Sequence, residues 1–343
     1  MMRKVAIIGH FSFKKDLLNG QTVKTKLLYE ALKTEYGDRE ITAFDTAGGK
    51  KAILRIPFQC FRALSGYKNI IVLPAHNGVR IIIPLLMKMN RLFGRKIHYV
   101  VIGGWLPKLV ESKKHLKKQL LKCDCIYVET NTMLRKLNDM GFCNCKVLPN
   151  FKPLVPINEF STKTEVPFKI CTFSRVSRLK GIEDLAKAVS AINNEAKQKV
   201  YTIDVYGTVD EGEESWFDSL REQYSDCVTY KGFVNYSDTV SVVKDYFMLV
   251  FPTKSFTEGI PGTIIDAYFS AVPVLASRWE SFDDVIDENV TGLGYAFNDE
   301  NDLKTTLLKI AANPEIVINM KKDCLIKAGK YLPQNAIELL SLS

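Results

Sequence analysis

The sequence predicts an α/β protein of two doubly wound domains with parallel sheets. Short apolar runs alternate with helical stretches, as in "VAIIG" before "QTVKTKLLYEALKTEYG" and "NIIVLPAH" before "VRIIIPLLMKMNRLFG". This alternation is typical of parallel sheets covered by helices. The run "LPNFKPLVPINEFSTKTEVPF" interrupts the pattern with four prolines, and a second series begins at "KICTFSRVS". We therefore place the domain junction in the proline-rich run.

The expected boundaries follow from that junction. Residues 1–165 are predicted to form a first Rossmann-like domain and residues 166–329 a second, with the C-terminal helix of about residues 330–343 a candidate to pack back on the first. Ligands of such sheets bind outside the carboxyl ends of the strands. Two facing domains are therefore expected to form a cleft lined by both sets of loops.

Length and composition fit a globular protein. The chain has 343 residues, of which 46% are hydrophobic and 25% charged, which predicts about two domains. No apolar run approaches the roughly 20 residues that span a bilayer. The start, "MMRKVAIIGHF", has too short an apolar run for a signal peptide and predicts a first strand. We expect a cytoplasmic location.

Two Cys-x-Cys pairs, Cys123 with Cys125 and Cys143 with Cys145, raise the question of a zinc site. Structural zinc sites usually space their ligands by two to four residues. Alternation in a strand explains "CDCIYV" equally well. We expect reduced structural thiols and no metal.

The stretch "FPTKSFTEGIPGTIIDAYFSAVPVLAS" places Glu258 and Asp266 on either side of a predicted helix start at Pro261. On that helix, Ile264, Ile265, Tyr268 and Phe269 share one side, while Gly262, Thr263, Asp266 and Ser270 share the other. Free N–H groups at a helix start bind anions such as phosphate. Two flanking carboxylates suit a sugar–diphosphate–ribose ligand. The alternative is a capped helix start with a solvated Asp266.

A second candidate loop follows the first strand of the second domain. In "FSRVSRLKGIEDLAKAV", Arg175 and Lys180 lie in the loop and Gly181 precedes a helix. A guanidinium and an ammonium there suit a diphosphate. The alternative is a basic surface loop.

These motifs are similar to those of the retaining GT-B glycosyltransferases of family 4, which carry an Arg and a Lys five residues apart and a Glu-x7-Glu motif. The resemblance implies the GT-B architecture, two Rossmann-like domains facing a cleft, and covers nearly the whole chain in order. Its segments are Asn19-Gly20-Gln21, "VLPNF", "SRVSRLKG", "VYG", "YKGFV", "VFPTKSFTEGIPGTIIDAY", "AVPVLAS" and "NVTGLGY".

The resemblance implies roles for individual residues. Arg175 and Lys180 would neutralise the donor diphosphate, and Glu258 would contact the hydroxyls of the donor sugar. The remaining donor-binding residues would contact sugar, phosphate, ribose or base, with Asp266 on the ribose. They are Gly20, Gly207, Phe233, Val234, Gly259, Ile260, Pro261, Gly262, Thr263 and Asp266.

Two positions depart from the family pattern. The second acid is Asp266 rather than Glu, one methylene shorter. Gly103 and Gly104, in "HYVVIGGWLP", stand where the family often has a His-Gly pair near the acceptor, and glycines there would permit a close approach of the backbone to substrate. His76, in "LPAHNG" at another strand end, is a candidate substitute, the alternative being an incidental loop histidine.

The implied function is transfer of a sugar from a nucleotide sugar, UDP-linked, to a lipid-linked or saccharide acceptor in surface polysaccharide biosynthesis. The anomeric configuration would be retained, without an obligatory metal, and cationic groups would stabilise the leaving diphosphate. Two alternatives remain, because fold alone does not separate them. One is a nucleotide-sugar epimerase of the same architecture, and the other is a catalytically silent sugar-nucleotide binder.

The formal net charge of +9 raises the question of a negatively charged partner. Residues 88–122 hold ten Lys and Arg against Glu111 alone. An anionic membrane surface would be attracted to such a patch, with Lys113, Lys114, Lys117 and Lys118 as contacts on the inner face of the plasma membrane. A solvated basic face is the alternative. We expect no nucleic acid partner, because no binding motif is present.

Overall fold

The computed structural model describes residues 2–13, 20–48, 50–340 and 342, with residues 50–52 described by their backbone alone. The chain divides into two compact units. Unit 1 comprises Met1–Pro153 and Tyr331–Ser343, and unit 2 comprises Leu154–Lys330. The division falls in the proline-rich run, ahead of the boundary that we placed after residue 165, and the C-terminal segment is part of unit 1.

In the part of unit 1 that is described, parallel strands form a six-stranded sheet in the order β2-β1-β3-β4-β5-β6. Its inner strands are mainly apolar runs buried on both faces, as expected for a parallel sheet covered by helices. They are β1 (Arg3–Gly9), β2 (Ile41–Asp45), β3 (Tyr67–Leu73), β4 (Lys96–Val100), β5 (Cys125–Val128) and β6 (Cys145–Val147).

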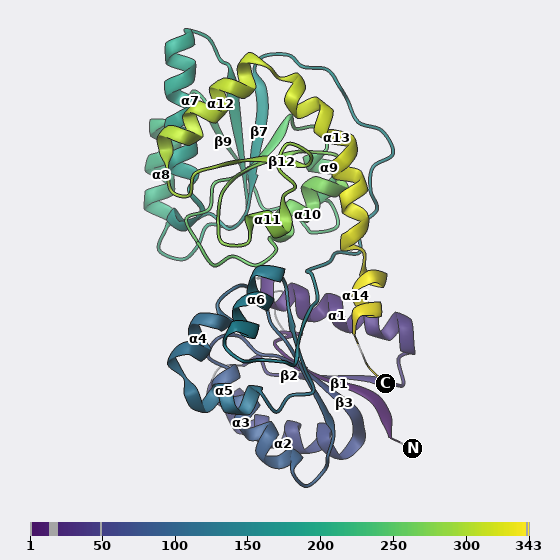
Figure 1. Ribbon diagram of the computed structural model, residues 1–343. Coiled ribbons are helices and arrows are strands. Elements are labelled where there is room, and N and C mark those ends of the chain that lie inside the picture. The colour runs from purple at the N-terminus through teal and green to yellow at the C-terminus, as the bar shows by residue number, and fades with distance from the viewer. Residues whose placement is uncertain (1, 14–19, 49, 341, 343) are drawn as a thin grey trace. The chain divides into compact units, whose positions relative to one another are not determined.

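Helices cover both faces of this sheet (Figure 1). One face carries α2 (Lys50–Gly66), α3 (Val79–Asn90), α4 (Leu106–Ser112), α5 (Lys114–Leu120) and α6 (Asn131–Asp139). The other face carries α1 (Gly20–Tyr36) and α14 (Pro333–Leu339). Ala336 and Ile337 of α14 are buried in one apolar cluster with Leu28 and Leu32 of α1.

The described residues of unit 2 form a second parallel six-stranded sheet, in the order β12-β11-β10-β7-β8-β9. The predicted α/β class is therefore confirmed. The strands are β7 (Phe168–Phe173), β8 (Tyr201–Tyr206), β9 (Val228–Gly232), β10 (Met248–Phe251), β11 (Val274–Ser277) and β12 (Gly292–Tyr295).

Figure 1 shows α7, α8 and α12 on one side of this sheet and α9, α10 and α13 on the other. The 3-10 turn η1 (Arg178–Lys180) leads into the first of these helices, and η2 (Gly329–Tyr331) follows the last. The helices are α7 (Ile182–Ala196), α8 (Glu214–Gln223), α9 (Thr239–Val243), α10 (Gly262–Phe269), α11 (Phe282–Val285), α12 (Glu300–Ala312) and α13 (Glu315–Ala328).

The strand order reverses direction once in each sheet. In unit 2 the chain runs from β7 outward to β9 and then returns to place β10 on the other side of β7. In unit 1 the corresponding reversal lies between β1 and β3. A doubly wound sheet opens a crevice at such a point, outside the carboxyl ends of the two strands.

Candidate active site

Two loops meet at the strand reversal of unit 2, one after β7 and one after β10. The backbone N–H of Lys254 donates to the carbonyl oxygen of Leu179 at 2.8 Å. Gly181 lies in the left-handed region with φ +67°, and a Cβ there would lie 1.8 Å from the carbonyl oxygen of Pro252. Only glycine permits this close approach. Gly181 therefore allows the loop after β7 to pack against the loop after β10.

The crossing places Lys180 against Glu258. The Lys180 Nζ lies 2.6 Å from Glu258 Oε1, which also accepts a hydrogen bond from Thr253 Oγ1 at 3.3 Å. The side chains of Lys180 and Glu258 are 17% and 24% exposed, so both reach water. Two residues 78 positions apart, each predicted to bind the donor, therefore lie together at the reversal point.

The start of α10 follows directly after Glu258. Pro261 is the N-cap residue, with extended ψ of 128°, and the helix begins at Gly262. The first N–H groups of a helix have no partner within it. The buried Oγ1 of Thr263 also lacks a hydrogen-bond partner among the described residues. Gly259 and Ile260 are buried beside this start.

Asp266 is buried on α10 rather than open to solvent. Its exposed fraction is 2%, and every residue from Ile264 to Ser270 is buried. Asp266 Oδ1 accepts a hydrogen bond from Thr239 Oγ1 of α9 at 3.0 Å. The alternative of a solvated Asp266 is wrong, because α9 packs against the side of α10 that we expected to be polar. The ribose-binding role stays a prediction.

Arg175 follows β7 and is exposed. Its guanidinium donates from one NH1 to both carboxylate oxygens of Asp210, each at 3.1 Å. No contact among the described residues joins Arg175 to Lys180 or Glu258, so the structure pairs the predicted cations with two different carboxylates.

Gly207 ends β8 at a close backbone approach. Its φ is +131°, and a Cβ would lie 1.8 Å from the carbonyl oxygen of Ser174. Its own carbonyl accepts a hydrogen bond from Tyr230 Oη at 2.8 Å. The close packing against Ser174 is therefore sufficient to require glycine at position 207, independently of any contact with a ligand. After the neighbouring β9, Phe233 is exposed and Val234 half-buried.

The acceptor-side candidates lie together in unit 1. The His76 ring, after β3, meets the Trp105 ring edge to face at 5.2 Å. Gly103, after β4, has φ +80°, and a Cβ there would lie 3.4 Å from the same indole. Gly104 beside it is buried. The glycine pair at the position of the family's His-Gly pair and His76, the candidate substitute for that histidine, thus both lie against Trp105.

His76 is held further by its neighbours in sequence. Its Nε2 lies 3.2 Å from an Arg80 guanidinium nitrogen and its Nδ1 lies 3.3 Å from Asn77 Oδ1. Because Arg80 can only donate, Nε2 is the acceptor in this contact. Gly20 is the first residue of α1, with space around its Cα, while Asn19 lies outside the described residues.

Sequence reasoning missed several side chains at these edges. Thr253 holds Glu258, and Asp210 holds Arg175. A third case is the buried pair of Lys24 in α1 and Glu129 after β5, with Nζ and Oε1 2.5 Å apart. Thr253 and Glu129 lie within two residues of the carboxyl end of a strand. That position in the sequence could have identified them as candidate site residues.

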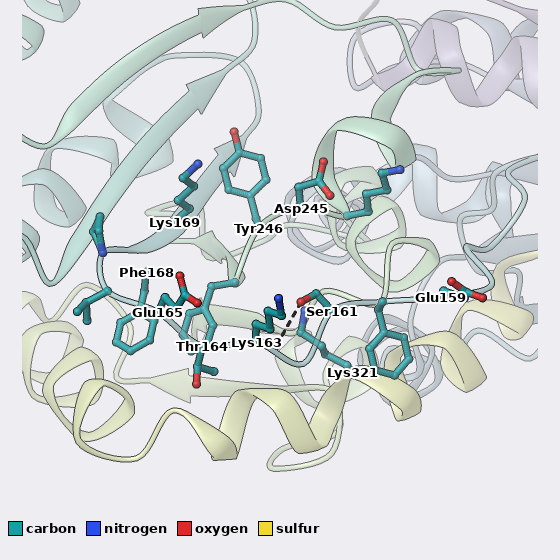
Figure 2. A pocket seen from close by; sticks show the side chains of 15 residues that line it. Glu159, Ser161, Lys163, Thr164, Glu165, Phe168, Lys169, Asp245, Tyr246 and Lys321 are labelled. Atoms are coloured by element: carbon teal, nitrogen blue, oxygen red, sulfur yellow. Dashed lines mark hydrogen bonds between the residues drawn. The ribbon is translucent and has the colours of Figure 1, made fainter.

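A cavity of about 560 Å³ lies elsewhere on unit 2 (Figure 2). It is lined by residues 159–161 and 163–169, Lys244 to Phe247 and Lys321. Phe168 begins β7 and Phe247 precedes β10, so the cavity lies at the amino edge of the sheet. The predicted donor residues follow the carboxyl ends of the same strands, and the cavity is a separate feature.

Two further findings concern metals and membranes. Within the described ranges, no group of three His, Cys, Asp or Glu side chains is placed to hold a metal ion. Cys123 and Cys145 are free thiols, and burial raises their pKa to about 12. No helix among the described residues is both long and apolar enough to cross a bilayer.

Solved structures of similar fold are found at low sequence identity. Sucrose-phosphate synthase from Thermosynechococcus elongatus is 16% identical with a TM-score of 0.78, covering 98% of this chain and 96% of that one. HepE of Anabaena, solved with UDP and glucose, is 13% identical with a TM-score of 0.72 and 99% of each chain covered. TarM of S. aureus is 19% identical with a TM-score of 0.62, covering 79% of this chain and 53% of that one.

These similarities show that the chain has the GT-B fold. Residues 167–313 match the sequence profile of the family described as Glycosyl transferases group 1. Unit 2 therefore carries a domain of that family, which includes Arg175, Lys180, Glu258 and Asp266. A search of curated protein sequences gave no significant match.

Proposed function

We propose that the protein is a retaining glycosyltransferase of family 4 type that moves a sugar from a UDP-linked donor to a lipid-linked or saccharide acceptor in surface polysaccharide biosynthesis. The observation that carries the proposal is the Lys180–Glu258 pair, held at the strand reversal of unit 2 and next to the start of α10. The ammonium of Lys180 can bind the diphosphate, and the carboxylate of Glu258 can bind the sugar hydroxyls. The backbone N–H groups at the start of α10 can bind phosphate oxygens.

The donor would exchange partners within this pair. Lys180 would turn from Glu258 to the diphosphate, and Glu258 would then accept hydrogen bonds from the sugar hydroxyls. Because both side chains reach water, the exchange exposes no unpaired buried charge. Thr263 Oγ1 and the backbone amides from Gly259 to Thr263, apart from Pro261, which has no N–H, would complete the contacts with sugar and phosphate.

Charge stabilisation is the chemical contribution that we assign to unit 2. The bond between the anomeric carbon and the β-phosphate oxygen breaks, and a bond to the acceptor oxygen forms on the same face of the sugar. The acceptor's proton leaves with the nucleoside diphosphate. Lys180, the start of α10 and Arg175, once released from Asp210, would stabilise the developing negative charge, so we propose that no metal is needed.

The acceptor is proposed to bind at the carboxyl edge of unit 1. His76, Gly103 and Gly104 surround Trp105 there, and the ring offers an apolar face against which a sugar can pack. The His76 ring would form a hydrogen bond with an acceptor hydroxyl. The lysines Lys113, Lys114, Lys117 and Lys118 are proposed to hold the protein peripherally on the inner face of the plasma membrane.

The ligands bound in similar structures support the donor class. HepE has been solved with UDP, with UDP-glucose, and with UDP and glucose. TarM has been solved with UDP and alpha-GlcNAc-glycerol, and the pneumococcal O-GlcNAc transferase GtfA with UDP and GlcNAc. These are the reasons for proposing a uridine nucleotide for this chain.

The deciding experiment incubates the purified protein with a panel of nucleotide sugars, with and without a lipid-linked acceptor and with and without EDTA. We expect nucleoside diphosphate release to rise on adding acceptor, with an EDTA-insensitive rate and an α-linked product from an α-linked donor. Release of diphosphate together with an epimerised sugar, without acceptor, would identify an epimerase. Binding of UDP-sugars without turnover under any condition would identify a silent binder.

A further inference from the structure

Helix α2 carries apolar side chains on both of its sides. Ile56, Cys60 and Leu64 face the core of unit 1 and are buried. Leu54, Phe58 and Phe61 are 83%, 63% and 50% exposed. Their i, i+4, i+7 spacing places them in one outward stripe, where a surface helix ordinarily carries polar residues.

The stripe continues onto the turn after α3. The ring of Phe61 meets the ring of Phe93 edge to face, with centroids 5.7 Å apart. Leu92, next to Phe93, is 88% exposed. We call Leu54, Phe58, Phe61, Leu92 and Phe93 the α2 patch. Contiguous exposed apolar side chains of this kind mark interaction sites in soluble proteins.

The sequence segment that contains the patch carries charges of one sign. Residues 46–110 contain eleven Lys and Arg and no Asp or Glu. Arg55, Arg62 and Arg91 are exposed beside the patch, and the Arg62 guanidinium lies 5.8 Å from the centre of the Phe58 ring. On the same face of the sheet, α3 packs between α2 and the lysine-bearing α5.

We propose that this face of unit 1 docks on an anionic lipid bilayer, with the α2 patch entering the boundary between headgroups and acyl chains. Exposed Phe and Leu flanked by Arg suit that boundary, because the rings enter the apolar layer while the guanidinium groups contact phosphates. A continuous region of one charge sign fits a uniformly negative surface. The apolar contact adds binding that salt does not screen, which the α5 lysines alone cannot supply.

The inference goes beyond the proposed sugar transfer and is tested without donor or acceptor, so each can fail separately. The full chain is floated with vesicles of equal parts phosphatidylcholine and phosphatidylglycerol at about 0.1 M and about 1 M salt, where the Debye length is about 10 Å and about 3 Å. We expect binding to weaken with salt but to persist at the higher concentration. Absence of binding, or its complete loss at high salt, would overturn the proposal.

Matched variants separate the two contributions. The triple variant Leu54→Ser, Phe58→Ser, Phe61→Ser is expected to weaken binding at high salt at least about ten-fold, since apolar burial is lost. Arg55→Gln, Arg62→Gln, Arg91→Gln should instead weaken binding mainly at low salt. The control Ile326→Ser removes an equally exposed apolar side chain from α13 of unit 2 and should bind as the wild type does. Equal urea midpoints would show that all variants are folded.

Insertion is measured directly with Phe58→Trp. Its emission should shift to the blue on adding vesicles and be quenched by lipids brominated along the acyl chain. Vesicle binding with unchanged emission would place the α2 patch outside the bilayer. Wild-type dimers that the serine triple variant dissociates, with vesicle binding unaffected, would assign the patch to a second copy of the chain and also overturn the proposal.

Discussion

Each unit holds a Lys–Glu pair of nearly the same length at the carboxyl edge of its sheet, but the two differ in access to water. Lys24 and Glu129 in unit 1 lie 2.5 Å apart with side chains 3% and 4% exposed, and the Lys24 ammonium also donates to the Val101 carbonyl at 3.4 Å. Lys180 and Glu258 in unit 2 lie 2.6 Å apart at 17% and 24% exposure. Distance alone therefore does not distinguish a structural pair from a functional one.

Burial distinguishes the two pairs, because it determines whether the lysine and the glutamate can separate and bind other groups. Separating Lys24 from Glu129 would leave two charges without water, at a cost of several kcal/mol each. Separating Lys180 from Glu258 lets solvent or ligand replace each partner. The first pair thus ties α1 to the ends of β4 and β5, and the second is suited to exchange with a substrate.

The largest expected effect comes from breaking the buried pair. Lys24→Met should lower the free energy of unfolding by about 3 to 5 kcal/mol, because Glu129 is left as a buried charge. Urea denaturation measures the change.

A control on the same helix is Lys33→Met, which removes a more exposed pair with Asp38 at 3.1 Å and should cost at most about 1 kcal/mol. Equal losses in the two variants would show that burial does not set the value of these pairs.

A buried histidine in unit 1 predicts that the free energy of unfolding depends on pH, with a change similar in size to that expected for Lys24→Met. Burial lowers the pKa of His98 to about 4, with the nearby cations of Lys96 and Lys146 adding to the effect and Asp124 opposing it. The unfolded chain, with an ordinary pKa of about 6.5, takes up the proton first as the pH falls. Stability is therefore full above pH 6.5 and declines toward pH 4, by about 3 kcal/mol.

The measurement is the urea stability of the wild type and of His98→Gln across this range. The amide of Gln can still donate to Asn69, which the His98 Nε2 contacts at 3.2 Å, but does not titrate. Identical pH profiles for the two proteins would contradict the prediction.

Glu258→Gln tests the exchangeable pair. We expect turnover with a donor sugar nucleotide to fall about 100-fold, comparable to removing one group that stabilises a transition state, while affinity for the free nucleoside diphosphate changes little. Steady-state kinetics and calorimetry separate the two quantities.

Glu195→Gln is the matched control, because Glu195 forms a 2.6 Å pair with Lys304 on an exposed surface of unit 2. It should leave both quantities unchanged. If Glu258→Gln lost equal affinity for free nucleotide and for sugar nucleotide, the assignment of Glu258 to the sugar hydroxyls would be wrong.

The smallest effect is expected at Asp266. Asp266→Ala should weaken binding of the free nucleoside diphosphate about ten-fold, or 1.4 kcal/mol, because its assigned partner is the ribose. Thr239→Val removes the hydroxyl that contacts Asp266 Oδ1 and the Tyr236 carbonyl oxygen but keeps the Asp266 carboxylate, and should bind nucleotide normally. Unchanged affinity in Asp266→Ala, or equal losses in both variants, would assign the carboxylate to packing of α9 on α10.

Much of the site was predictable because it is local in sequence. Glu258 lies in the loop between β10 and α10, Pro261 caps the helix, and Gly181 has the conformation that its loop requires. The basic stretch "LPKLVESKKHLKKQLLK" forms two helices that meet at Lys113. Local patterns did not predict which carboxylate each cation meets.

The sequence by itself determined the class of fold, the division near the proline-rich run and the loops that carry the donor motifs, because periodicity, turn residues and helix starts act over a few neighbouring positions. The tertiary structure alone decided the burial of Asp266, the meeting of Lys180 with Glu258, the cluster of His76, Gly103 and Trp105, and the exposure of the α2 patch. These features depend on which elements pack together. Packing brings together residues that are tens of positions apart, and the local sequence around one of them does not indicate which residue it will contact.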